Sequence, residues 1–146
     1  ALNLLARYWP QERRDDWLMT PHPGEAARLL DLHGGEIQAD RLAAVEELQL
    51  RRGGVMLLKG AGSLVAGPSG VAVCPYGNPG MASGGMGDVL TGILAALVAQ
   101  GLELETAARV GVTLHARAAD LAAEAGGERG LLAGDLACYA RSLANL

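Results

Sequence analysis

The sequence has few aromatic residues: they make up 3% of the chain, and phenylalanine is absent. A core built without aromatic rings must be filled by aliphatic side chains, and 50% of the residues are hydrophobic. Charged residues reach only 19%, a balance that excludes a disordered chain. A composition rich in alanine, leucine and glycine favours helices packed closely on a sheet.

The sequence also lacks an excess of positive charge. Twelve lysines and arginines stand against 16 acidic residues, so the formal net charge is −4. Proteins that bind nucleic acid or anionic membranes need a basic surface, so neither partner is expected. Cys74 and Cys138 form no C-x-x-C pair, which indicates neither a disulfide framework nor a thiolate metal site. We therefore expect a cytoplasmic protein.

No long hydrophobic run is present. The most apolar stretch, residues 89–99, contains Thr91 and Gly92 and is shorter than the roughly 20 residues that a membrane span requires. The chain does not open with a cationic segment followed by an apolar one, as a signal peptide would. It opens at Ala1 inside an apolar helical pattern that no capping residue precedes, which we interpret as a cut through a larger domain.

The length of 146 residues is that of a single domain, in which strands and helices alternate. The first half is predicted to contain a short helix, an apolar run at 17–19, a rigid loop at 20–24, a helix at 25–32 that a glycine pair stops, and an amphipathic helix at 36–52. A buried strand follows at 55–58, and then two strands at 63–66 and 71–74 joined by a hairpin turn. The second half is predicted to contain a glycine-rich loop at 76–87, a buried helix at 88–100, a long helix at 103–125 and a last helix from about 135. This order predicts an α/β layered fold.

The densest functional signal is the glycine-rich loop that runs into the helix at 88–100. Glycines at 84, 85 and 87 allow successive N–H groups to converge, and a helix N-terminus behind them adds roughly half a positive charge. Such a loop can bind a phosphate. It matches neither a Walker A loop nor the G-x-G-x-x-G spacing, and a glycine loop that serves only tight helix packing is the alternative.

Asp88 follows these glycines directly. A carboxylate in the first helical turn is stabilised by the helix dipole, and it can act as general base on a hydroxyl that attacks a bound phosphate. An acid that merely stabilises the helix start explains Asp88 equally well.

Two further candidates follow short apolar runs. Lys59 is the only lysine and follows the predicted buried strand, at the position where α/β sheets bind ligands. A solvated surface charge is the alternative for Lys59. His22 stands between two prolines that fix its backbone, and its ring can serve either a ligand or a surface hydrogen bond. His33 and His115 are predicted to be structural.

Three segments in this order resemble one family. They are M-T-P-H-P-G-E at 19–25, L-K-G-A-G-S at 58–63 and G-N-P-G-M-A-S-G-G-M-G-D-V-L-T-G at 77–92. The chain resembles the ADP- or ATP-dependent NAD(P)H-hydrate dehydratases, a carbohydrate-kinase-like family, over essentially its whole length. The G-G-x-G-D element alone is shared by the wider ribokinase-like superfamily, whereas the other segments are specific to this family.

The resemblance implies a three-layer α/β/α ribokinase-like fold and a repair reaction. In that reaction a nucleotide phosphorylates the hydroxyl of hydrated NADH or NADPH, and phosphate then leaves with restoration of the ring double bond. ADP is favoured over ATP, and Mg²⁺ is expected on the nucleotide rather than in a protein cage.

The resemblance also implies roles for individual residues. Asp88 matches the base that also contacts the hydrated substrate, and His22 matches a substrate-binding histidine. The predicted nucleotide-binding residues are Lys59, Gly60, Ala61, Gly62, Ser63, Gly84, Gly85 and Gly87. No protein ligand set for a metal is predicted.

The resemblance begins part-way along the family domain. Residues 1–146 are therefore interpreted as one partial domain that lacks the N-terminal portion. Family domains commonly associate and are often fused behind an NAD(P)H-hydrate epimerase, so a homo-oligomer and an upstream epimerase domain are expected. Two other functions stay open: a ribokinase-like kinase for a small alcohol or vitamin precursor, and a non-catalytic nucleotide-binding fragment.

Overall fold

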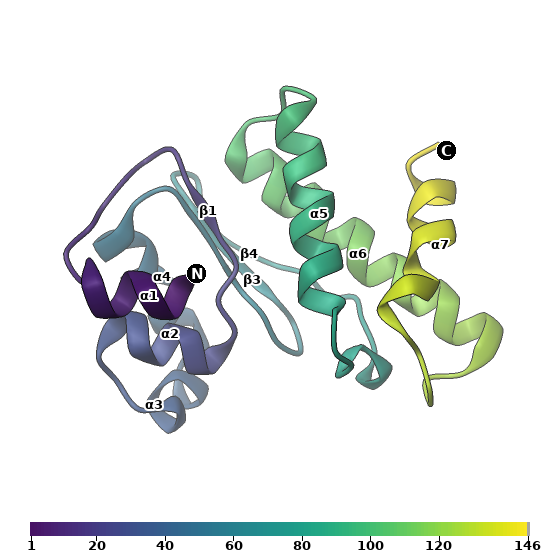
Figure 1. The fold of residues 1–146 in the computed structure, drawn as a ribbon, viewed down its shortest axis with the longest axis horizontal. Coiled ribbons are helices and arrows are strands. Elements are labelled where there is room, and N and C mark those ends of the chain that lie inside the picture. Colours follow the sequence, from purple (N-terminus) through teal and green to yellow (C-terminus); the bar gives the residue numbers. More distant parts are fainter. Residues whose placement is uncertain (146) are drawn as a thin grey trace. The chain divides into compact units, whose positions relative to one another are not determined.

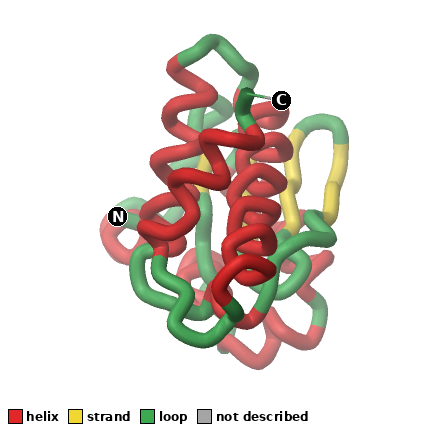
Figure 2. The backbone as a smooth tube through the Cα atoms, turned by 90° about the vertical axis from the view of Figure 1, so that its right-hand side faces the viewer, coloured by secondary structure: helices red, strands yellow, loops and turns green. Residues whose placement is uncertain are grey.

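The computed structural model describes residues 1–145, and the chain divides into two compact units, Ala1–Val73 and Cys74–Leu146. Each unit is described by itself. Figure 1 colours the chain from one end to the other, so the first unit runs from purple to teal and the second from green to yellow. Figure 2 shows that helices and loops make up most of the backbone and that the strands are short.

The first unit is a four-stranded mixed sheet with helices. Its helices are α1 (Leu2–Tyr8), α2 (Pro23–Leu30), α3 (Gly34–Ala39) and α4 (Arg41–Arg52), and its strands are β1 (Leu18–Met19), β2 (Val55–Leu58), β3 (Leu64–Gly67) and β4 (Gly70–Val73). The strand order is β1-β2-β3-β4; β1 pairs parallel to β2, and the other pairs are antiparallel. The predicted α/β class, the buried strand and the β3–β4 hairpin are confirmed.

The core of the first unit lies between the helices and one face of the sheet. Side chains alternate across a strand, so Met56 and Leu58 of β2 share a face with Leu64 and Ala66 of β3. These residues join the aliphatic core whose other buried members are Met19, Ala26, Ala27, Leu29, Leu30, Ile37, Ala44, Val45 and Leu48. Each fully buried leucine or isoleucine contributes about 1.5–3 kcal/mol.

The predicted start of the second helix is wrong by two residues. The rigid loop was expected to extend through Gly24, but α2 begins at Pro23. A proline in the first helical turn loses no hydrogen bond, since that N–H has no partner within the helix. The predicted end at residue 32 is also wrong, because α2 ends at Leu30 and its C-cap residue Asp31 has a φ of 58°, in the left-handed region. The glycine pair that was expected to stop this helix is the start of α3.

The single amphipathic helix expected at 36–52 is two helices. α3 ends at Ala39, and α4 starts at Arg41. Between them Asp40 takes a non-helical conformation, and its carboxylate accepts the N–H of Ala43 at 2.9 Å. The apolar spacing continues across the break, which is why the pattern alone suggests one helix.

The second unit is helical. It contains the short 3-10 helices η1 (Pro79–Met81) and η2 (Ala133–Asp135) and the helices α5 (Met86–Ala99), α6 (Leu104–Gly126) and α7 (Leu136–Leu143). Both α5 and α7 pack on α6, and Figure 1 shows the two crossing it at different points along its length. The predicted long helix is confirmed as α6, and its small buried residues allow this close approach.

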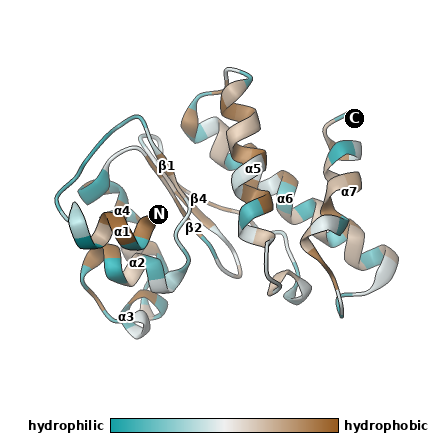
Figure 3. Cartoon of the chain, viewed as in Figure 1, coloured by the Kyte–Doolittle hydropathy of each residue, from teal (hydrophilic) through white to brown (hydrophobic). Residues whose placement is uncertain are grey.

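Helix α5 is apolar along most of its length, as Figure 3 shows by its brown ribbon. The expectation that it is buried on nearly every side is wrong, because only Met86, Leu90 and Leu94 are buried. These residues follow each other at a spacing of four and therefore lie on one face. Among residues 1–145 no helix is long and apolar enough to cross a membrane.

Candidate functional site

One group of predicted residues lies at an edge of the sheet in the first unit. β1 and β2 are parallel neighbours, so the segments that follow them leave the sheet at the same edge. The N–H of Lys59 donates to the carbonyl oxygen of Pro21 at 2.9 Å. The structure thus brings the loop that carries His22 beside the segment that begins at Lys59.

His22 is the N-cap residue of α2. Its Nδ1 accepts the N–H groups of Gly24 at 3.1 Å and Glu25 at 3.3 Å, and the Glu25 carboxylate accepts the His22 N–H at 2.9 Å. This capping box explains why a T-P-H-P-G-E segment starts a helix. Since Nδ1 uses its lone pair here, a neutral His22 carries its proton on Nε2. The side chain is half exposed, and Nε2 lies 3.5 Å from the Glu25 carboxylate, so the ring edge that carries Nε2 faces both this acid and solvent.

The predicted nucleotide segment, residues 59–63, forms an open turn. Gly60 and Ala61 are exposed, and Lys59 is half-buried. The Ser63 hydroxyl donates to the Gly60 carbonyl at 3.1 Å, and Gly62 has a φ of 64° that favours glycine. The backbone here is therefore both fixed and accessible.

Arg41 at the start of α4 contacts this turn, which the sequence did not predict. Its Nη1 donates to the carbonyl of Ala61 at 2.5 Å, and its Nη2 lies 3.5 Å from that of Leu58. Nothing in the spacing of residues 41 and 59 indicates this contact.

The second group lies at the start of α5 in the second unit. Gly85 is the N-cap residue, with a φ of 87°, and a Cβ added there would lie 3.2 Å from the Cβ of Ala133. A Cβ added at Gly84 would meet no atom within 4 Å, so the loop is open at that point. The first N–H groups of a helix have no partner within it, which makes this turn suited to an anion.

Asp88 is exposed in the first turn of α5, and its N–H donates to the carbonyl of Gly85 at 3.0 Å. Its carboxylate therefore lies at the same helix end as Gly84, Gly85 and Gly87. This placement agrees with the base role and with the simple helix-stabilising role alike.

Asp120 of α6 holds the loop at Gly77 and Asn78, which comes before the glycine turn, and the sequence also did not predict this contact. Its carboxylate accepts the N–H of Gly77 at 3.2 Å and the side-chain amide of Asn78 at 3.1 Å. The Asn78 oxygen in turn accepts the N–H of Gly80 at 3.0 Å. The G-N-P-G part of the motif thus has a structural purpose. Asp120 interrupts an alanine-rich helix, but no spacing rule connects it to residue 77.

His33 and His115 both lie at positions where they support the fold. His33 is the N-cap residue of α3, and His115 is buried on α6. Burial lowers the pKa of His115, and a hydrogen bond with the Met86 backbone opposes that shift only in part. Met86 directly follows Gly85, so the buried imidazole supports the start of α5.

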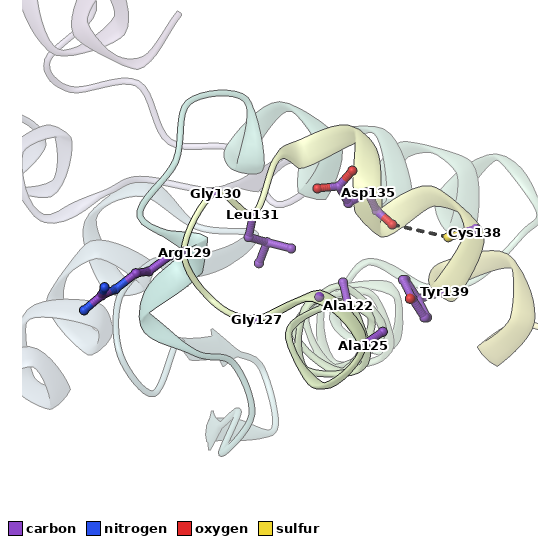
Figure 4. A pocket seen from close by; sticks show the side chains of 10 residues that line it. Ala122, Ala125, Gly127, Arg129, Gly130, Leu131, Asp135, Cys138 and Tyr139 are labelled. Carbon is purple, nitrogen blue, oxygen red and sulfur yellow. Dashed lines mark hydrogen bonds between the residues drawn. The ribbon is translucent and has the colours of Figure 1, made fainter.

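The predicted residues divide between the two units: His22 and residues 59–63 belong to the first, and the glycines and Asp88 belong to the second. A common site that contains both groups stays a prediction. An open hollow of about 430 Å³ in the second unit is lined by residues from the end of α6 to the start of α7, and none of the predicted residues lines it (Figure 4). Among residues 1–145 no cluster of three or more histidine, cysteine or acidic side chains could hold a metal ion.

Solved structures with the same fold define the class of this protein. A ribokinase-like superfamily protein from Enterococcus faecalis aligns with 99% of this chain and 50% of its own, at a TM-score of 0.80 and 26% identity. An ADP/ATP-dependent NAD(P)H-hydrate dehydratase from Bacillus subtilis, co-crystallised with ATP and Mg²⁺, aligns with 92% of this chain and 51% of its own, at a TM-score of 0.83 and 28% identity. The fold is therefore ribokinase-like.

Within that class, a family model described as NAD(P)H-hydrate dehydratase matches residues 1–142, and the chain belongs to this family. A bifunctional NAD(P)H-hydrate repair enzyme from Coxiella burnetii is 55% identical over 146 residues, 99% of this chain and 30% of the relative. An ADP-dependent (S)-NAD(P)H-hydrate dehydratase from Neisseria meningitidis is 47% identical over 130 residues, 88% of this chain and 44% of the relative. The chain thus spans less than half the length of these two relatives.

Proposed function

We propose that the protein containing this sequence dehydrates hydrated NADH or NADPH at the expense of a nucleotide, with ADP preferred. The observation that carries the proposal is the Gly85-capped start of α5, where an open glycine turn and the Asp88 carboxylate occupy one helix end. Membership of the dehydratase family supports it.

The first step is a phosphoryl transfer. Asp88 takes the proton of the hydroxyl on the hydrated nicotinamide ring as the hydroxyl oxygen bonds to the terminal phosphorus of the nucleotide. The bond between that phosphorus and the bridging oxygen breaks, so that AMP leaves with the bridging oxygen when ADP is the nucleotide. The N–H groups at the start of α5 stabilise the charge that spreads over the phosphate oxygens.

The second step is an elimination. The phosphate leaves with the electrons of the carbon–oxygen bond, the adjacent ring carbon loses a proton, and the ring double bond returns. No oxidant or reductant is needed. The turn at residues 59–63 contributes accessible backbone groups and Lys59 for the nucleotide, and the Nε2–H of His22 contributes a donor for the hydrated cofactor.

Mg²⁺ fits this arrangement as a companion of the nucleotide. Magnesium sites of this kind use one or two carboxylates together with substrate phosphates, and Asp88 is the one acid among residues 80–92. Such an ion would neutralise phosphate charge. The choice of ADP draws support from the Neisseria relative, which is named ADP-dependent.

The wider assembly is part of the proposal. The Coxiella relative is named a bifunctional repair enzyme and is much longer than this chain, which agrees with an epimerase domain in the same polypeptide. Self-association of the dehydratase domain and a cytoplasmic location are proposed on the family resemblance alone.

The test is to incubate the full natural protein with hydrated NADH and ADP. The proposal predicts recovery of the NADH absorbance together with equal amounts of AMP and phosphate. A stable phosphorylated product without elimination would indicate a kinase instead. ADP binding by residues 1–146 in a calorimetric titration, without turnover by the full protein, would indicate a nucleotide-binding protein that is not a catalyst.

A further inference from the structure

The side chain of Arg41, the first residue of α4, reaches the predicted nucleotide segment. Its two terminal nitrogens donate to different carbonyls: Nη1 to that of Ala61 at 2.5 Å, and Nη2 to that of Leu58 at 3.5 Å. These carbonyls flank Lys59 and Gly60. The guanidinium therefore bridges the end of β2 and the turn that follows it.

Gly60 is shaped by the same contact. A Cβ added at Gly60 would lie 2.7 Å from Nη2 of Arg41 and 3.1 Å from its Cζ. The φ of 152° at Gly60 is also one that other residues rarely adopt. The glycine thus gives the guanidinium room to lie directly against the backbone.

The charge of Arg41 has no acidic partner among the ion pairs of residues 1–145. Its Nε is buried and makes no hydrogen bond in that part of the chain. Placing a guanidinium in this way has a cost, because burial of an unpaired donor is unfavourable. This cost in folding free energy is offset if function requires the carbonyls of Leu58 and Ala61 to be held in one fixed arrangement.

We propose that Arg41 is a positioning residue for nucleotide binding. By bridging the carbonyls of Leu58 and Ala61, it holds the turn at 59–63 in the open form that accepts a nucleoside diphosphate. The planar fork of arginine is suited to two acceptors at once, whereas a lysine presents a single ammonium group. This inference rests on the proposed function.

The test compares three variants of the full natural protein. Arg41→Met removes the bridge, Arg41→Lys keeps the charge without the fork, and Arg51→Met is the matched control on the same helix, where Arg51 contacts Glu47 and the Leu30 carbonyl instead. For both Arg41 variants we expect the KM for ADP to rise about tenfold or more with kcat within about threefold of wild type. Arg51→Met should leave both constants unchanged.

A second readout does not depend on activity. Hydrogen exchange without ligand should become at least about tenfold faster at the amides of Lys59 and Gly60 in Arg41→Met, and stay unchanged in Arg51→Met. Unchanged exchange at these amides, or full recovery of the ADP KM by Arg41→Lys, would overturn the positioning role. Wild-type protein that fails to turn over hydrated NADH would instead contradict the proposed function, and the exchange result would still decide the role of Arg41.

Discussion

The imidazole of His22 has two separable tasks. Its Nδ1 caps α2 through two backbone N–H groups, while Nε2 on the other side of the ring is proposed to contact the hydrated cofactor. A single substitution to alanine would remove both groups, so a loss of activity would not distinguish them.

Asparagine is a good N-cap residue without an Nε2 donor, so it separates these tasks. We expect His22→Asn to change the free energy of unfolding by less than about 0.5 kcal/mol, whereas His22→Ala lowers it by about 1 kcal/mol. Urea denaturation measures both. His22→Asn should still raise the KM for hydrated NADH, and an unchanged KM would show that the ring serves only the helix.

His115 makes stability depend on pH. Because its pKa is lowered in the folded protein, the unfolded chain binds more protons as the pH falls below about 6.5, the ordinary histidine value. Above that pH the ring is neutral in both states, so His115 does not reduce the free energy of unfolding. As the pH falls from there towards the folded pKa, the free energy of unfolding decreases.

We expect His115→Gln to flatten this dependence between about pH 7.5 and 5.5, as measured by urea denaturation at several pH values. His33→Gln, at the exposed start of α3, is the control and should leave the slope as in wild type. A slope in His115→Gln as steep as that of wild type would assign the dependence to other groups.

At the scale of whole elements, the start of α4 depends on a single cap. Asp40→Ala removes the acceptor of the Ala43 N–H and should lower the free energy of unfolding by about 1 kcal/mol. Asp40→Asn keeps an acceptor oxygen and should cost much less. Thermal denaturation of the two variants in parallel decides this, and equal losses would mean that the carboxylate does not act as a cap.

The contact between α5 and α6 depends on a glycine. A Cβ at Gly111 would lie 2.6 Å from Cδ2 of Leu94 and 3.3 Å from Cδ1 of Leu97. Overpacking of this kind costs about 1–3 kcal/mol, which exceeds the gain in helix propensity.

Gly111→Ala should therefore lower the free energy of unfolding by about 1 kcal/mol. Gly92→Ala is the matched comparison on α5, since a Cβ there meets nothing within 4 Å, and it should raise stability by about 0.5–1 kcal/mol. Denaturant unfolding of both variants measures the difference. Stabilisation by Gly111→Ala would show that the Leu94 side chain moves aside at little cost.

The elements differ in how far the sequence predicts them. The apolar run of β2 and the glycine-flanked hairpin of β3 and β4 are local signals, and the structure confirms them. The division between α3 and α4 has no such signal, because the apolar spacing passes through Asp40. The burial of α5 was overestimated, because composition records how apolar a helix is and not which of its faces has a neighbour.

At the scale of the whole molecule, the proposed chemistry needs residues from both units. The motifs predict His22, residues 59–63 and residues 84–88 together, since family resemblance links segments that are distant in the chain. The positioning contacts of Arg41 and Asp120 could not be predicted, because an arginine or aspartate on a helix looks the same whether it faces water or a loop carbonyl.

The chain spans less than half the length of the Coxiella and Neisseria relatives, so its catalysis has to be measured in the full natural protein. Asp88→Asn is the variant of choice, because it keeps the shape of the side chain and removes the base. Glu124→Gln, an exposed acid near the end of α6, is the control.

The central claim is that Asp88 is the general base of an ADP-dependent dehydration. The most direct test measures turnover of hydrated NADH and ADP affinity side by side for wild type, Asp88→Asn and Glu124→Gln. We predict that Asp88→Asn reduces kcat by at least about 10²-fold while ADP affinity stays near that of wild type, and that Glu124→Gln changes neither. An Asp88→Asn enzyme with wild-type turnover would contradict the account.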